Sequence, residues 1–209
     1  DKGKIICKER KMSIEAIYSR RSIRKYKADK VPLNMIEKII EAGRNAPSGK
    51  NKQPWKFTVF GGDQKDEMLL AMERGIQREL NEESLLPKDR NGLPDAINTL
   101  KIMKEAPIVI MVLDSDCKTP FERITAEYRI TEIVNTLSIG AAIQNMLLQA
   151  EDLGLGTLWV GNTFFAYEEL CSYLETDMQL VGAIAVGYPN EKPDVRPRKP
   201  IDSIVEYRI

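Results

Sequence analysis

Hydrophobic residues recur along this chain with two spacings, and each spacing predicts a different kind of element. After Pro32, the apolar side chains of Met35, Ile36, Ile39 and Ile40 keep the spacing of one helix face, and proline is common at a helix start. The same criterion predicts helices over residues 13–19, 32–43, 64–80, 97–105, 124–153 and 166–174.

Short continuous apolar runs predict buried strands. These runs are residues 55–60, 107–114, 156–160 and 179–189. Strands and helices alternate poorly after residue 114, which favours an α+β fold over a doubly wound one. We expect a central sheet flanked by helices, with 124–153 as a long core helix because it is very apolar from Ile133 to Ala150.

Two segments differ from this globular pattern. Residues 81–96, NEESLLPKDRNGLPDA, are polar and contain two prolines, so they resemble a mobile excursion or lid. The C-terminal RPRKPIDSIVEYRI is proline-rich and closes on a strand-like run, and a tail of this kind often wraps another subunit.

Composition narrows the class of protein. The chain has 209 residues, which suits one domain over 13–209. Lys+Arg and Asp+Glu both number 31, so no global field attracts nucleic acid or an anionic membrane surface. Histidine is absent and the cysteines number 3 without a C-x-x-C pair, so we expect no metal site, no disulfide framework and a reducing, cytoplasmic location. A catalyst of this composition would leave its chemistry to an organic cofactor.

The chain start carries no secretory signal that we recognise. DKGKIICKERKMS lacks the apolar core of a leader peptide, and no apolar run reaches the roughly 18 residues of a membrane span. Met12 is a candidate natural start, which would make residues 1–12 an N-terminal extension.

Positive charge is concentrated in RRSIRKY, residues 20–26, and again in RPRKP near the C-terminus. Arginine forks match phosphate oxygens, and a serine hydroxyl adds a donor, so a compact doubly negative ligand would explain both clusters. A solvated charge patch is the alternative for the first cluster, and an ordinary Arg/Pro tail for the second.

Two further stretches are candidates for contact with a flat ligand. In APSGKNKQPW, small residues allow close backbone approach and two amides can meet a heterocycle edge; an ordinary loop is the alternative. In GLGTLWVGN, residues 154–162, a bare backbone N–H can face a ring, and a helix C-cap is the alternative. This stretch lacks the third glycine of a Rossmann fingerprint, and no P-loop motif occurs.

The order of RRSIRKY, APSGKNKQPWKF, GLGTLWVG and VGYP…RPRKP resembles the nitroreductase family of FMN-dependent oxidoreductases, from about Ile14 to the C-terminus. The resemblance implies a mainly antiparallel sheet and an intertwined homodimer with two FMN sites. It assigns the phosphate and ribityl chain to Arg20, Arg21, Ser22, Arg24, Arg196 and Arg198.

The resemblance also assigns the contacts with the flavin ring. Those from the other subunit would be Pro47, Ser48, Gly49 and Asn51, while Val160 and Gly161 would present backbone near N5. Asn98 and Lys101 match positions at the pyrimidine edge, where a cation favours anionic reduced flavin. No protein side chain is expected to be catalytic, because the flavin carries the chemistry.

By resemblance, the reaction would be ping-pong hydride transfer from NAD(P)H through flavin N5 to a nitroaromatic, quinone or related small acceptor. Two alternatives stay open. One is a flavin-binding carrier or redox sensor without substantial turnover. The other is a phosphate-ester or nucleic-acid binding module, which the zero net charge and the absence of a recognised motif disfavour.

Overall fold

The computed structural model describes residues 14–81, 86 and 90–209. The expected N-terminal extension 1–12, and residues 82–85 and 87–89 of the expected excursion 81–96, lie outside the described part of the chain. The helices are α1 (Glu15–Ser19), α2 (Leu33–Arg44), α3 (Gly62–Leu80), α4 (Leu93–Glu105), α5 (Ala126–Asp152) and α6 (Tyr167–Tyr173). The strands are β1 (Trp55–Gly61), β2 (Ile108–Asp114), β3 (Gly156–Val160) and β4 (Gln179–Gly187).

The four strands form one antiparallel sheet in the order β1-β2-β4-β3. Side chains of β2 alternate between the two faces: Val109 and Met111 join one hydrophobic cluster, and Ile110 and Val112 join the other. Both central strands are apolar at nearly every position because both faces of the sheet are covered. The α+β class and the antiparallel sheet predicted from the sequence are confirmed.

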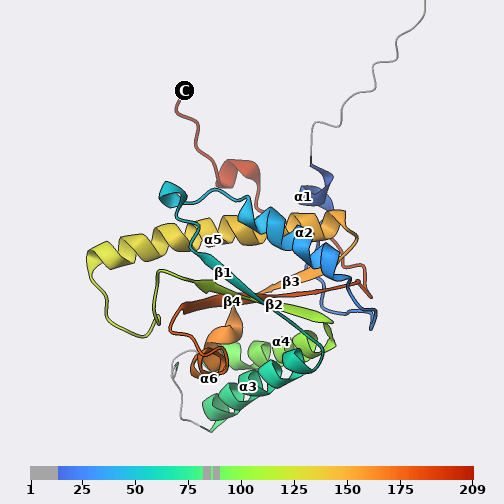
Figure 1. Ribbon diagram of the computed structural model, residues 1–209. Coiled ribbons are helices and arrows are strands. Elements are labelled where there is room, and N and C mark those ends of the chain that lie inside the picture. Colours follow the sequence, from blue (N-terminus) through green and yellow to red (C-terminus); the bar gives the residue numbers. More distant parts are fainter. Residues whose placement is uncertain (1–13, 82–85, 87–89) are drawn as a thin grey trace, which may run out of the picture.

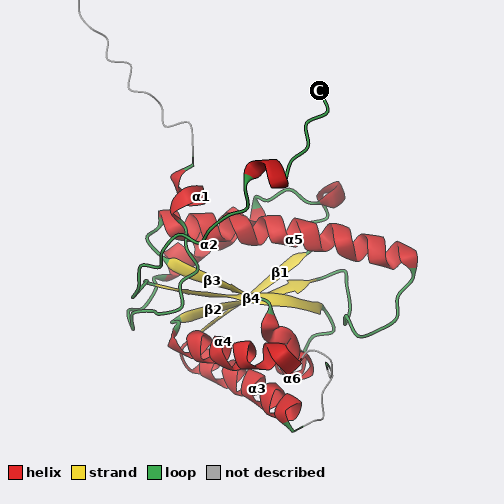
Figure 2. Ribbon diagram, turned by 180° about the vertical axis from the view of Figure 1, so that it is seen from behind, coloured by secondary structure: helices red, strands yellow, loops and turns green. Residues whose placement is uncertain are grey.

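The helices cover the sheet in two layers (Figures 1 and 2). Helices α2 and α5 pack on one face, where Ile39, Ile143 and Met146 meet the strands. Helices α3, α4 and α6 pack on the other, around Met68 and Met103. The C-terminal segment rises away from the body on the α5 side and is exposed from Val195 onward.

Helix ends follow local chemistry. Thr125 caps α5, its hydroxyl accepting the N–H of Tyr128 at 3.2 Å. The helix stops at Gly154, whose φ of +74° suits glycine; Leu155 N–H donates to Ala150 O at 2.8 Å and Gly154 N–H to Glu151 O at 3.0 Å. This is a Schellman motif, so the helix-cap interpretation of Gly154 is correct.

Only one face of the long helix α5 is buried. Residues Ile139, Ile143 and Met146 are fully enclosed, whereas Leu137 is 70% exposed and Ile130 is 63% exposed. Apolar side chains therefore continue around the helix to an outer face that remains exposed to solvent among the described residues. The strand-like run expected at residues 204–209 forms no strand: a 3-10 turn at Ile201–Ser203 precedes it and no strand of the sheet pairs with it.

Candidate functional site

Residues 20–26 lie between strand β3 and the segment that follows β4. Ser22 bridges Thr157 of β3, and the N–H of Ile23 donates to Thr157 O at 2.9 Å. Gly156 permits this contact, because a Cβ there would lie 2.6 Å from Ile23. On the other side, Asn190 N–H donates to Lys25 O at 2.9 Å. The arginine cluster is therefore part of the folded body and not a free surface loop.

The C-terminal segment brings its arginines to the same place. A cavity of about 100 Å³ is lined by Arg20, Arg21, Ser22, Arg24, Pro193, Asp194, Val195, Arg196 and Arg198. The six residues expected to hold a phosphate thus converge, although about 170 positions separate the two groups. Within the described part of the chain, none of the five arginines forms an ion pair with a carboxylate. Five arginines against the one carboxylate of Asp194 leave the described lining with an excess of positive charge, which is typical of an anion site.

The arginines differ in the hydrogen bonds that they already form with backbone carbonyls. The Arg21 guanidinium donates to the carbonyls of Tyr18, Ser19 and Arg20 at 2.7, 3.0 and 2.8 Å, so it is engaged with the C-terminal end of α1. Arg24 donates once, to Ser22 O at 3.2 Å. We therefore expect Arg24 to be free for a ligand and Arg21 to act mainly by shaping the turn.

A carboxylate that the sequence did not single out fixes this turn. Glu191 accepts hydrogen bonds from the backbone N–H groups of Arg24 and of Lys25, the second at 3.2 Å. Both bonds go to Oε1 of Glu191, so this carboxylate oxygen is used on the backbone and the arginine side chains stay available. Burial, with the charge of Glu191 as a further cause, also raises the pKa of the neighbouring Tyr26 phenol far above its usual value.

A larger cavity of about 450 Å³ adjoins the first, and Arg24 and Arg196 line both. Its other walls include Asn98 and Thr99 of α4, the β3 residues Trp159 and Val160, and Gly161. A Cβ at Gly161 would meet nothing within 4 Å, so the backbone there is bare toward the cavity. Lys101 is exposed and is not among the lining residues, so the structure brings Asn98 to the site but not Lys101.

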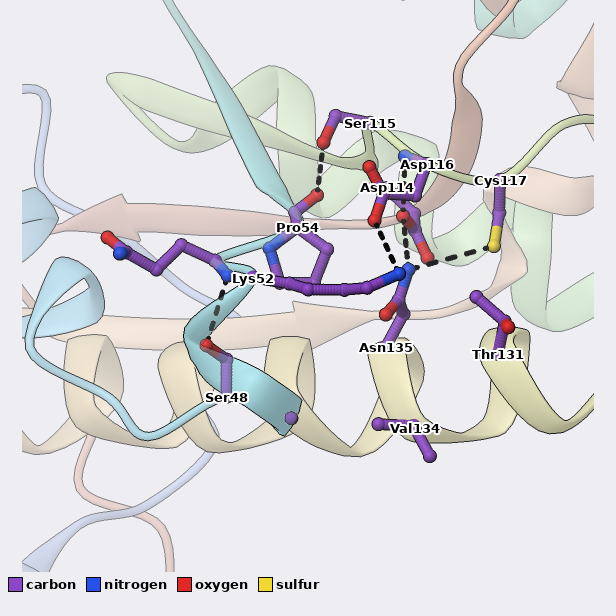
Figure 3. A network of polar contacts seen from close by, with 12 residues as sticks. Ser48, Lys52, Pro54, Asp114, Ser115, Asp116, Cys117, Thr131, Val134 and Asn135 are labelled. Carbon is purple, nitrogen blue, oxygen red and sulfur yellow. Dashed lines mark hydrogen bonds and ion pairs between the residues drawn. The ribbon is translucent and has the colours of Figure 1, made fainter.

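The loop that carries Pro47, Ser48, Gly49 and Asn51 lies elsewhere, along the N-terminal half of α5 (Figures 1 and 3). It lines neither cavity of its own chain. The N–H of Gly49 donates to the Ser138 hydroxyl at 3.2 Å, and that hydroxyl donates to Val134 O at 2.8 Å. A Cβ at position 49 would overlap Cγ1 of Val134, so only glycine allows this approach.

The same loop holds an unusual backbone. Lys50, Asn51 and Gln53 have φ of 54°, 55° and 51°, although none is glycine. Each such residue costs of order 1 kcal/mol and persists only where the surroundings enforce it, often at functional sites. The Gln53 N–H donates to Ser48 Oγ at 3.0 Å, which closes the loop on itself (Figure 3).

A polar network, exposed at Lys52 and Asp116 and buried at Asp114, anchors the end of this loop to the sheet (Figure 3). Lys52 Nζ lies 3.5 Å from Asp116 Oδ2, and Ser115 N–H donates to Pro54 O at 2.8 Å. Behind them, fully buried Asp114 accepts from Asn135 Nδ2 at 3.1 Å. Burial, together with Asp114, raises the pKa of the Cys117 thiol to about 12, so this thiol stays protonated and unreactive.

Two general features bear on the chemistry. Among the described residues, no group of three or more His, Cys, Asp or Glu side chains is arranged to hold a metal ion. No helix in the described part of the chain is both long and apolar enough to cross a membrane.

Comparison with known proteins agrees with this architecture. Residues 17–188 match the model of the nitroreductase family. A candidate NADH dehydrogenase/NAD(P)H nitroreductase of Methanothermobacter thermautotrophicus is 32% identical over 88% of this chain and 80% of its own. An iodotyrosine deiodinase of Thermotoga neapolitana is 26% identical over 94% of this chain and 98% of its own. In structure, a candidate nitroreductase of Desulfovibrio desulfuricans in complex with FMN superposes with a TM-score of 0.69 at 27% identity, covering 94% of this chain and 96% of the other.

The fold and the match over residues 17–188 define the class of protein: an antiparallel α+β oxidoreductase fold. The chain belongs to the nitroreductase family. The assignment made from four short motifs in order is thereby confirmed.

Proposed function

We propose that this protein binds FMN and uses it to oxidise NAD(P)H and reduce a small acceptor. The observation that carries the proposal is the pair of adjoining cavities. The smaller has five arginines without ion-pair partners among the described residues, and the larger is lined by the bare backbone of Gly161 and by Asn98. A small cationic cavity that continues into a larger one suits a flat ring bearing a phosphate at the end of a chain.

The residues fit FMN group by group. Arg20, Arg24, Arg196 and Arg198, with the Ser22 hydroxyl, would hold the phosphate. Val160 and Gly161 would offer backbone to the ring, and Asn98 would offer an amide to its polar edge. Lys101 is the weakest member of this set, since it lies outside the cavity lining.

The site requires a second copy of the chain in this proposal. Pro47, Ser48, Gly49 and Asn51 lie away from their own chain's cavities, so they would flank the flavin of the partner. The outer face of α5 supports such a homodimer, because Ile130, Ile133 and Leu137 are exposed on it. Apolar side chains grouped in this way on a surface usually mark an interface.

FMN, when bound at this site, would supply the hydride-transfer chemistry between NAD(P)H and the acceptor. For a quinone the balance is NAD(P)H + quinone + H⁺ → NAD(P)⁺ + hydroquinone. The chain itself would bind the flavin, orient it and tune its reactivity. Guanidinium groups fix one end of the ligand, and the rigid strand end at Val160–Gly161 fixes the other, so that both substrates meet the same ring face.

The names of the relatives support this reaction class and leave the acceptor open, since a nitroreductase and a deiodinase both resemble the chain. Steady-state NADH and NADPH oxidation by FMN-loaded protein tests the proposal, with 1,4-benzoquinone or a nitroaromatic as acceptor. Turnover that depends on both substrates and shows parallel double-reciprocal lines supports it. Bound flavin without acceptor-dependent turnover would instead indicate a carrier or redox sensor.

A further inference from the structure

A third cavity, which has aromatic walls, adjoins the candidate flavin site. It has a volume of about 600 Å³, and its lining includes Pro120, Phe121, Phe164 and Phe165. Ring contacts hold these walls in place. Phe164 lies parallel to Tyr167 with centroids 6.1 Å apart, and Phe121 meets the same tyrosine edge-on at 5.3 Å. Since Tyr167 is buried, the two walls are fixed relative to one another.

This aromatic chamber is continuous with the cavity assigned to the flavin ring. Asp95, Gly161 and Asn162 line both. The Asn162 amide donates to Thr99 Oγ1 at 3.0 Å, and this bond holds the Asn162 side chain in position where the two cavities meet. A planar molecule in the chamber would therefore lie next to whatever occupies the space at Gly161.

The described residues that line the chamber carry only negative charge. Of its described lining residues, Asp95 alone is titratable. The carboxylate lies in the first turn of α4, where the helix dipole favours negative charge. It forms no ion pair with any described residue. Arg24 and Arg196 line only the neighbouring cavity, and a bound phosphate would neutralise them.

We infer that this chamber receives the aromatic ring of the acceptor, and that Asp95 selects neutral or cationic aromatic acceptors against anionic ones. The inference rests on the proposed function and adds to it the chemical class of the substrate. Asp95 acts here as a specificity-determining residue: it touches the acceptor's surroundings and takes no part in electron transfer. Apolar walls supply affinity for any flat ring, while the carboxylate of Asp95 supplies the discrimination by charge.

Three nitrobenzenes that differ only in their para substituent test this inference: 4-nitrobenzoate, 4-nitrobenzamide and (4-nitrobenzyl)trimethylammonium. The oxidative half-reaction of pre-reduced, FMN-loaded protein is followed by stopped flow with each. In the wild type, we expect the cation and the amide to react with higher second-order rate constants than the anion. In Asp95→Asn, the cation-to-anion ratio should fall about 5- to 20-fold, a range that allows for solvent screening of an exposed charge.

A matched control separates local charge from net charge. Asp63 lies in the first turn of α3, as Asp95 does in α4, but lines neither cavity. Asp63→Asn should leave the ratio unchanged. A second variant, Phe121→Ala, removes a wall that is 41% exposed and so should fold normally. It should weaken the reaction with all three acceptors about equally.

The outcomes distinguish a failure of the inference from a failure of the proposed function. An unchanged ratio in Asp95→Asn, or a wild-type preference for the benzoate, would overturn the inference while leaving the proposed function intact. If the wild type binds FMN but reacts neither with benzoquinone nor with any of the three compounds, the proposed function itself fails.

Discussion

The hydroxyl of Ser138 accepts a hydrogen bond from the backbone N–H of Gly49 at 3.2 Å, across 89 positions of the sequence. This contact ties the strained loop to the middle of the longest helix. It matters for function because the loop is the part of the proposed flavin site that the partner subunit contributes. The helix and the loop would thus position the ring, while the arginines hold the phosphate.

Replacing Ser138 with Ala should weaken flavin binding through the ring and not through the phosphate. The Gly49 N–H loses its acceptor, a loss of about 1–2 kcal/mol, or roughly 5- to 30-fold in affinity. Since the phosphate contacts are untouched, FMN and riboflavin should lose affinity by the same factor, measured by fluorescence titration. Ser138→Thr keeps the hydroxyl and should restore binding, while Ser172→Ala, at an exposed position of α6, should have no effect.

Replacing Gly49 with Ala should force the loop away from α5, because the new methyl group overlaps Val134. We expect a loss of about 1–3 kcal/mol in the free energy of unfolding, as for overpacking elsewhere. The double variant Gly49→Ala, Val134→Ala should recover most of it, since the overlapping methyl group is then absent. Additive losses in chemical denaturation would show that the two side chains do not meet.

Replacing Arg24 with Ala should lower the affinity for FMN and leave the affinity for riboflavin nearly unchanged. It removes one charge-assisted hydrogen bond to the phosphate, worth about 1.5–3 kcal/mol. The affinity for FMN should fall roughly 10- to 150-fold, and the affinity for riboflavin should hardly change. Arg74→Ala, an exposed arginine on α3, serves as the charge-matched control. Equal losses for both ligands would place Arg24 away from the phosphate.

Replacing Leu137 with Glu tests assembly. The side chain is 70% exposed in the single chain, so the substitution costs the monomer little. If the outer face of α5 is a dimer interface, a buried carboxylate there should dissociate the dimer at micromolar concentration in sedimentation velocity. Flavin affinity should fall with it, because the loop of the partner is lost. A variant that stays dimeric would move the interface to another surface.

The sequence predicted the elements and the arginine cluster well, and it missed the residues that hold them. RRSIRKY is recognisable because its charges are adjacent, and apolar spacing marks the helices and strands directly. Glu191 and Ser138 carry no local signal, since their partners lie 167 and 89 positions away. Single polar residues of this kind acquire meaning only after the chain has folded.

Two local features differ from the prediction. The helix predicted over 97–105 already begins at Leu93, because Pro94 lies in the first turn of α4, where the missing N–H has no helical partner to lose. The strand-like run that closes the C-terminal segment pairs with no described strand, and its wrapping of another subunit stays a prediction. The lid role of 81–96 stays a prediction, because residues 82–85 and 87–89 lie outside the described part of the chain.

The central claim is that the two adjoining cavities hold FMN and that this flavin accepts hydride from NAD(P)H. The visible absorption spectrum of the purified, FMN-reconstituted protein, recorded anaerobically before and after adding NADH or NADPH, tests it most directly. We predict the visible absorption bands of protein-bound flavin, about one flavin per chain, that bleach on addition of at least one nucleotide. Protein that retains no flavin after gel filtration, or bound flavin that neither nucleotide bleaches, would contradict the claim.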